Sequence, residues 1–257
     1  MLVPVLLFLF GFVLLIKGGD WFVDGAVGIA HRFHLSELLI GATVVSIGTT
    51  LPEVMVSATS AIGGHGDIAY GNAIGSVICN TALVAAIPIA FRPSEADRDS
   101  LKIPVLFFFT AAVFYAAVAY LTGFFSRAVG AVLLGLFLVY MFITVRKAIS
   151  APKLSSGKDA PTEETEESKE SEPLYKAILK LVIGAACIAW GANLLVDNGT
   201  KIAAALGVPD SVIGLTMVAL GTSLPELVTA VTALIKGHSA LSLGNIIGAN
   251  LFNLVLV

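Results

Sequence analysis

One polar motif occurs twice in this chain, each time inside a long apolar stretch. Gly-Thr-Thr-Leu-Pro-Glu ends at Glu53, and Gly-Thr-Ser-Leu-Pro-Glu ends at Glu226, which lies 226 − 53 = 173 residues later. The same offset aligns residues 41–84 with residues 214–257 without a gap, and 19 of these 44 pairs are identical. Self-similarity at a fixed offset is the signature of a repeated structural unit. The chain is therefore predicted to be an internal duplication.

The composition places the chain in a membrane. Its mean hydropathy is +0.93, with 57% hydrophobic and only 13% charged residues, which is typical of integral membrane proteins and excludes an ordinary soluble domain. The net charge of −3 gives no reason to expect a nucleic-acid partner. Neither Cys79 nor Cys187 has the spacing of a metal ligand. The run His31–His34 lacks the glutamate of a zinc-protease motif, so we expect no enzyme and no cofactor.

A membrane-spanning helix needs about 20 apolar residues, and eight stretches of the chain meet that length. They lie at approximately 2–30, 37–62, 68–91, 101–121, 127–147, 175–203, 211–236 and 240–257. We therefore predict an all-α polytopic membrane protein with eight transmembrane helices.

A hydrophilic segment divides these helices into two unequal groups. Residues 150–173 are rich in Lys, Glu, Ser and Thr, a composition that cannot bury enough apolar area to fold. We expect a solvated acidic linker between a first repeat of five helices (1–149) and a second of three (174–257). Since five is odd, the second repeat enters the bilayer from the opposite side, which gives inverted topology. A complete five-plus-five fold would have ten helices, so the second repeat is expected to be truncated.

Basic residues fall on alternate loops, which predicts orientation. The intervening loops carry only Arg127. We expect the basic loops and the linker to be cytoplasmic, the N-terminus outside, and the protein in the plasma membrane. The basic loop residues are Arg32, Arg92, Arg98, Lys102, Arg146, Lys147, Lys153 and Lys158.

Each motif brings oxygen ligands to membrane depth. Because proline has no backbone N–H, Pro52 leaves the carbonyl of Gly48 without its helical partner, and Pro225 has the same effect on Gly221. The glycines make local unwinding easy, so each helix is predicted to open there. The motif hydroxyls belong to Thr49, Thr50, Thr222 and Ser223. Carbonyls, hydroxyls and carboxylates suit hard cations such as Ca²⁺ and Na⁺.

The pseudo-twofold relation of the repeats should bring Glu53 and Glu226 together near the bilayer midplane. Two close carboxylates repel each other and are costly in lipid, so bound cations or protons must balance them. One divalent ion, or two or more monovalent ions, would restore near neutrality. Asn80 and Asn253 each follow their glutamate by 27 residues and offer neutral amide oxygens. Ser76 shares a helical face with Asn80, whereas its counterpart is Ala249, which predicts an asymmetric site.

These motifs, followed by Gly-Asn-Ala-Ile-Gly-Ser-Val-Ile-Cys-Asn ending at Asn80 and Gly-Asn-Ile-Ile-Gly-Ala-Asn-Leu-Phe-Asn ending at Asn253, resemble the two α-repeats of the sodium/calcium exchanger family. The resemblance implies ten helices in two inverted halves and a central site at which Ca²⁺ and Na⁺ compete. It also implies that Glu53 and Glu226 ligate Ca²⁺ and that the long first and sixth helices slide as a gating pair. The motif hydroxyls and Ser76 would complete the Ca²⁺ and Na⁺ sites, with Asn80 and Asn253 beside them.

We therefore expect a secondary antiporter that exchanges Ca²⁺ for Na⁺ by alternating access. Two alternatives stay open. A Ca²⁺/H⁺ exchanger would use the same glutamates, and a cation channel would use the same oxygen ligands without coupling to a counter-ion. The three aspartates near the ends of the first and sixth helices, Asp20, Asp24 and Asp197, are interpreted as interfacial residues rather than ligands.

Overall fold

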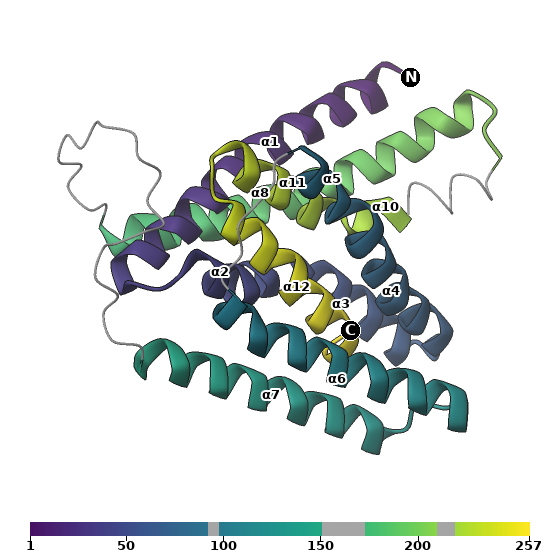
Figure 1. Ribbon diagram of the computed structural model, residues 1–257. Helices are drawn as coiled ribbons and strands as arrows, with labels where there is room; N and C mark the ends of the chain where they lie inside the picture. The colour runs from purple at the N-terminus through teal and green to yellow at the C-terminus, as the bar shows by residue number, and fades with distance from the viewer. Residues whose placement is uncertain (92–97, 151–172, 210–218) are drawn as a thin grey trace.

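The computed structural model describes residues 1–91, 98–150, 173–209 and 219–257, and every regular element in these ranges is helical (Figure 1). The first repeat contains α1 (Leu2–Phe33), α2 (Glu37–Ile40), η1 (Gly41–Val45), α3 (Ser46–Ile62), α4 (Gly66–Cys79), η2 (Asn80–Val84), α5 (Ala86–Phe91), α6 (Arg98–Thr122) and α7 (Arg127–Ser150). The second contains α8 (Leu174–Ala205), α10 (Ala219–Thr222), α11 (Leu224–Ile235) and α12 (Ser239–Val255). Here η1 and η2 are single π-helical turns inside otherwise continuous helical rods.

The described helices confirm the predicted all-α membrane fold. Six helical segments of the described chain are long and apolar enough to cross a membrane: Leu2–Phe33, Glu37–Ile62, Gly66–Phe91, Arg98–Thr122, Arg127–Lys147 and Leu174–Ala205. The apolar helices α11 and α12 are shorter. The start of the predicted seventh span and nearly all of the predicted linker at 150–173 lie outside the described residues.

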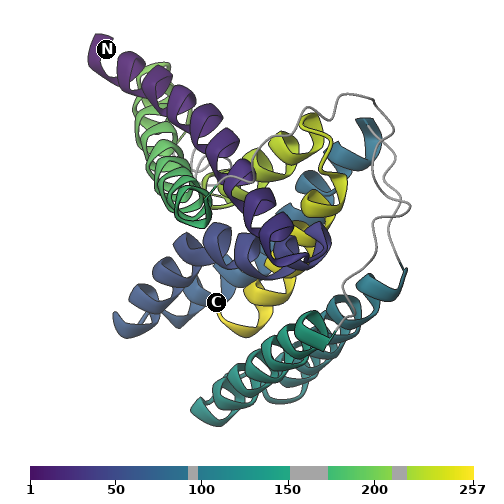
Figure 2. The ribbon, with the colours of Figure 1, turned by 90° about the vertical axis from the view of Figure 1, so that its left-hand side faces the viewer.

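The two longest helices, α1 and α8, pack against each other as an antiparallel pair (Figures 1 and 2). Glycines form the seam between them. Gly11 faces Gly191, and Gly18 faces Gly184, so closely that a Cβ at any of these positions would meet the backbone of the opposite helix. Gly18 and Gly191 are equivalent in the two repeats, as are Gly11 and Gly184. This seam of small residues, which lets two helix backbones approach, therefore has the twofold symmetry that the duplication predicts.

The shorter helices form the centre of the molecule. α12 packs against η1, α3 and α2, while α3 contacts α4 and α11 contacts α12. Glycines again permit the closest approach: Gly244 meets the backbone of Leu38 and Ala42, and Gly248 meets Ala42 and the Ser46 hydroxyl. The motif-bearing helices of both repeats are thereby held side by side.

A third layer, α6 and α7, covers one flank of this centre (Figure 2). Its contact with α12 is aromatic: the Phe137 and Tyr140 rings both lie edge-on to Phe252. The Tyr140 hydroxyl donates a hydrogen bond of 2.9 Å to the carbonyl of Ala42 in η1. The flanking layer thus anchors the π-helical turn just upstream of the first motif.

The helix ends that carry the predicted basic clusters lie together on the left of Figure 1, where α1 and α7 end and α6 and α8 begin. A hydrogen bond of 2.9 Å from the Lys147 ammonium to the Asp99 carbonyl joins the end of α7 to the start of α6. The predicted basic clusters within the described ranges therefore lie at one end of the molecule, whereas Arg127 begins α7 at the opposite end of that helix; these clusters contain Arg32, Arg98, Lys102, Arg146 and Lys147.

Candidate ion-binding site

The two motif glutamates are the most deeply buried acidic residues among those described. Glu53 on α3 and Glu226 on α11 are both 0% exposed. The helices that carry them contact each other, and the Thr50 hydroxyl, one turn before Glu53, donates to Glu226 Oε1 over 3.4 Å. The duplication therefore brings both carboxylates into one buried cluster.

The backbone around the two motifs differs. In the first copy α3 runs without interruption from Ser46 to Ile62, with Pro52 inside it. The prediction that the helix opens at this proline is therefore wrong for the first copy, where the irregular turn lies upstream at η1. In the second copy the helix does break: α10 ends at Thr222, and α11 starts after Ser223 with Pro225 in its first turn.

The motif glycines pack against the long helices α1 and α8. A Cβ added at Gly48 would lie 3.0 Å from the Phe22 ring of α1, and one added at Gly221 would overlap Val196 of α8. Each motif is therefore in close contact with the long helix of its own repeat. A methyl group at Gly221 would force the side chain of Val196 to move.

Most of the predicted ligands are withdrawn from solvent. Gly48 and Thr222 are partly buried. The fully buried members are Thr49, Thr50, Glu53, Ser76, Asn80, Gly221, Ser223, Glu226 and Asn253. Ser76 and Asn80 lie at the junction of α4 and η2, and Asn253 lies on α12. The predicted set is thus distributed over the four central rods rather than over the flanking layers.

Many of these buried polar atoms have no hydrogen-bond partner within the described part of the chain. The unpartnered ligand-type oxygens are both carboxylate oxygens of Glu53, Oε2 of Glu226, the hydroxyls of Ser76 and Ser223, and the amide oxygens of Asn80 and Asn253. A buried polar group without a partner costs about 1–3 kcal/mol, and more when it is charged. A hard cation would satisfy several of these oxygens at once, since Ca²⁺ takes six to eight oxygen ligands.

The described residues contain no cluster of three or more His, Cys, Asp or Glu side chains that could hold a metal ion. A site here must therefore combine the two carboxylates with hydroxyl and amide oxygens. Such a ligand set fits Ca²⁺ and Na⁺, and it lacks the thiolate and imidazole groups that favour softer metals.

Three polar residues that tie this cluster together were not predicted from the sequence: Ser46 and Asn245 are buried, and Asn72 is partly buried. Ser46, Asn72 and Asn245 each hydrogen-bond to a motif residue or to one another across helices. The signal was present, because Gly71-Asn72 and Gly244-Asn245 are equivalent dipeptides in the alignment. Their contacts with the motifs depend on helix rotation, which the spacing alone does not fix.

Comparison with known proteins agrees with this geometry. The chain matches the family described as sodium/calcium exchanger protein over residues 3–146 and 176–257. It belongs to this family. A sodium/calcium exchanger of Methanosarcina acetivorans, MaX1, is 32% identical over 284 residues, covering 99% of this chain and 81% of that protein. An uncharacterised membrane protein of Methanocaldococcus jannaschii is 40% identical over 244 residues, covering 95% of this chain and 76% of that protein.

The fold is that of a solved exchanger as well. The structure of the sodium-calcium exchanger NCX_Mj, from a crystal soaked with 10 mM Na⁺ and 10 mM Sr²⁺, superposes with a TM-score of 0.83 at 37% identity, covering 99% of this chain and 80% of that chain. The relatives named here are membrane proteins and exchangers rather than enzymes. This exchanger-family chain is therefore an integral membrane protein with a cation-exchanger fold.

Proposed function

We propose that this exchanger-family protein is a secondary antiporter that moves Ca²⁺ in exchange for Na⁺ by alternating access at the cluster around Glu53 and Glu226. The observation that carries the proposal is the pairing of two buried carboxylates, three of whose four oxygens have no hydrogen-bond partner among the described residues. Two ionised carboxylates in a low-dielectric site need two positive charges nearby. One Ca²⁺ or two or more Na⁺ ions supply them. The same site can therefore hold either kind of ion, but it is unstable when it is empty and both carboxylates are ionised.

The proposed ligands combine the unpartnered buried oxygens with the remaining oxygens of the two motifs. Glu53 and Glu226 bind Ca²⁺, and the hydroxyls of Thr49, Thr50, Ser76 and Ser223, together with Thr222, complete the Ca²⁺ and Na⁺ positions. The amides of Asn80 and Asn253 lie beside them, and the motif carbonyls at Gly48 and Gly221 contribute backbone oxygens. Each hydroxyl or amide adds an oxygen without adding charge, so the site charge stays at −2.

The layered fold supports alternating access. α1 and α8 form their own antiparallel pair along a glycine seam, and they meet the motifs at Gly48 and Gly221. Close packing of the two backbones along this seam holds α1 and α8 together as one unit. We infer that movement of this pair opens the central site to one side of the membrane and then to the other. In this proposal the protein lies in the plasma membrane with its N-terminus outside and the 150–173 linker in the cytoplasm.

Proton coupling is the second candidate, because the same buried carboxylates can take protons instead of Na⁺. Transport in liposomes distinguishes the two. We expect the reconstituted protein to accumulate radiolabelled Ca²⁺ when the liposomes contain Na⁺ and the outside medium does not. Uptake that is indifferent to Na⁺ but follows an imposed pH gradient would transfer the assignment to Ca²⁺/H⁺ exchange. Downhill Ca²⁺ flux without either gradient would indicate a channel.

A further inference from the structure

The side chain of Asn245 connects the second repeat to the motif of the first. Asn245 is fully buried on α12. The Thr49 hydroxyl donates to its Oδ1 over 3.2 Å, and the Ser46 hydroxyl donates to its backbone carbonyl over 3.1 Å. Asn72, its equivalent, stays within its own repeat, where Nδ2 donates to the Glu53 carbonyl over 3.1 Å and to Ser57 Oγ over 2.9 Å.

A hydroxyl that ligates a cation must send its proton elsewhere. It has one proton and two lone pairs, so the acceptor that takes the proton decides where the lone pairs point. For Thr49 the acceptors within 3.5 Å are Asn245 Oδ1 and the Ser46 carbonyl, 3.3 Å away in the preceding turn of its own helix, and the hydroxyl also lies near the Glu226 carboxylate. An amide oxygen only accepts. Donation to Asn245 therefore holds the Thr49 proton toward α12 and leaves both lone pairs for a cation.

We infer that Asn245 is a positioning residue for the ion site: it acts through Thr49 and makes the ligand geometry of the first repeat depend on contact with the second. When α12 and α3 separate, the Thr49 hydroxyl loses this acceptor and turns toward the Ser46 carbonyl. Ion affinity is thereby coupled to the packing of the repeats. This inference rests on the proposed function, since it assumes that Thr49 binds the transported ion.

A double-mutant cycle tests the inference. Binding of radiolabelled Ca²⁺ to the purified protein is measured for wild type, Asn245→Leu, Thr49→Val and the double variant. A hydrogen bond is worth about 1 kcal/mol net, so each single substitution is expected to weaken binding about fivefold or more. The double variant should lose no more than the worse single one, because both remove the same interaction. Additive losses would overturn the inference.

Two further variants separate positioning from a purely structural role. Asn245→Asp keeps an acceptor of the same shape, so it should recover most of the Ca²⁺ affinity lost in Asn245→Leu. The matched control is Asn72→Leu, whose effect should add to that of Thr49→Val. If Asn245→Asp binds as weakly as Asn245→Leu and both lower the ion-free melting temperature equally, Asn245 only holds the fold. A wild-type protein that binds neither Ca²⁺ nor Na⁺ would refute the proposed function as well, whereas normal wild-type binding with an additive cycle refutes the inference alone.

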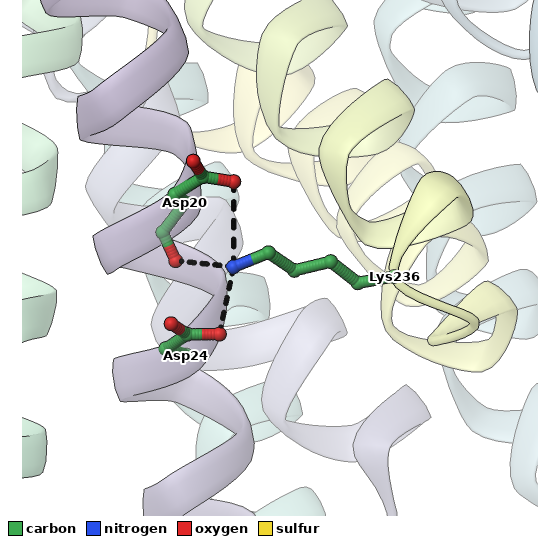
Figure 3. A network of polar contacts seen from close by, with 3 residues as sticks. All are labelled: Asp20, Asp24 and Lys236. Atoms are coloured by element: carbon green, nitrogen blue, oxygen red, sulfur yellow. Dashed lines mark hydrogen bonds and ion pairs between the residues drawn. The ribbon is translucent and has the colours of Figure 1, made fainter.

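An independent observation concerns Lys236, which follows the last residue of α11. Its ammonium lies 2.8 Å from Asp24 Oδ1 and 3.4 Å from Asp20 Oδ1, and it donates to the Asp20 carbonyl over 3.0 Å (Figure 3). Asp20 and Asp24 are one helical turn apart on α1, so one lysine engages both. The two aspartates that were interpreted as merely interfacial thus hold α1 against the end of α11.

This contact has no counterpart in the other half of the molecule. The residue equivalent to Lys236 is Gly63, and the residue equivalent to Asp20 is Asn193, although Asp24 is matched by Asp197. In a transporter built from inverted repeats, alternating access moves one bundle of helices against the other. Movement of α1 relative to α11 changes the distance between Lys236 and the two aspartates, and Gly63 offers no equivalent cation in the other repeat.

We propose that Lys236, Asp20 and Asp24 form an ionic latch that favours the conformation seen here over the opposite access state. Spin labels at the exposed positions Phe33 on α1 and Val145 on α7 report the position of α1 relative to the flanking layer. Lys236→Met should lower the ratio of the present conformation to the opposite one by up to about fivefold, because a partly exposed ion pair is worth up to about 1 kcal/mol.

A variant with swapped charges and a control at a surface ion pair complete this test. The double variant Lys236→Glu with Asp24→Lys restores opposite charges and should return the distance distribution toward that of wild type. Lys102→Met removes a solvent-exposed lysine that pairs with Asp99 inside α6, and it should leave the distribution unchanged. An unaltered distribution in Lys236→Met, or a charge exchange that behaves like Lys236→Met, would refute the latch.

Discussion

The two copies of the duplicated motif have nearly the same residues but different backbones. In the first repeat the chain passes Pro52 as a continuous helix and carries its irregular turn at Gly41–Val45, whereas in the second the helix breaks at Ser223. The two motifs therefore provide nearly the same side chains, but their backbones place these side chains differently. An inverted-repeat transporter needs this difference, since identical repeat conformations would open equally to both sides of the membrane.

The α1–α8 seam shows the opposite behaviour. Gly18 and Gly191 occupy equivalent positions and make equivalent contacts, each against the backbone of the other long helix. Symmetry is thus retained where α1 and α8 pack against each other, and it is broken at the motifs. Substitutions at equivalent positions should therefore have equal effects in the seam and unequal effects at the motif prolines.

The largest effect is expected at the carboxylates. Glu53→Gln and Glu226→Gln each keep the shape of the side chain but remove one of the two charges that balance Ca²⁺. Each should lower Na⁺-dependent Ca²⁺ uptake by at least about 100-fold, since the loss of a buried ion's partner costs about 3–5 kcal/mol. Uptake into proteoliposomes with internal Na⁺ measures this. If one variant retained uptake, Ca²⁺ transport would depend on a single carboxylate. The two glutamates would then be as unequal in function as the two motif backbones are in structure.

The next effect tests the symmetric region. Gly18→Leu and Gly191→Leu each force a side chain into the backbone of the opposite long helix, and overpacking costs about 1–3 kcal/mol. Both should lower the melting temperature of the purified protein by similar amounts. Gly135→Leu on α7, where a Cβ would meet nothing within 4 Å, is the control and should leave stability nearly unchanged. A clear difference between Gly18→Leu and Gly191→Leu would show that the long helices are not equivalent.

The prolines test the asymmetric region. Pro225→Ala restores a backbone N–H next to the break at Ser223 and allows α10 and α11 to join. We expect it to slow Ca²⁺ exchange about tenfold, a barrier change of about 1.4 kcal/mol. Pro52→Ala lies in a helix that is already continuous, so its effect on the exchange rate should be smaller. Equal losses in initial-rate measurements would mean that the break at Ser223 is not used in transport.

Residue patterns predicted the parts of this molecule that depend on hydropathy and on the duplication. Apolar runs located the six long membrane helices, and the fixed offset, together with the odd number of helices in the first repeat, predicted that Glu53 and Glu226 lie close together. Pro225 and Gly221 correctly predicted the break near Ser223, but the same motif also predicted a break at Pro52, where α3 is continuous. The π-helical turn at Gly41–Val45 could not be predicted, because the same motif letters occur with both backbones. The contact of Asn245 with Thr49 was also not predicted. It depends on how α12 is rotated about its axis when it packs, which directs the amide toward Thr49 rather than toward its own repeat.

The smallest effect concerns the one clear chemical difference between the two ligand sets. Ser76 contributes a buried hydroxyl with no partner among the described residues, and its equivalent is the fully buried Ala249. Ser76→Ala should weaken Na⁺ binding about fivefold, and Ala249→Ser should strengthen it by a smaller factor, because a new hydroxyl gains a ligand contact only after it loses its hydration.

The exchange variant Ser76→Ala with Ala249→Ser moves that oxygen from one repeat to the other at constant composition. Competition of Na⁺ with radiolabelled Ca²⁺ then measures how equivalent the two positions are. If the site were symmetric, the exchange variant would match wild type. We expect it to stay at least about threefold weaker for Na⁺, a difference near 0.7 kcal/mol, because α4 passes into a π-helical turn beside Ser76 whereas α12 continues as a regular helix beyond Ala249. Full recovery would mean that the difference between the two motif backbones does not affect ion binding.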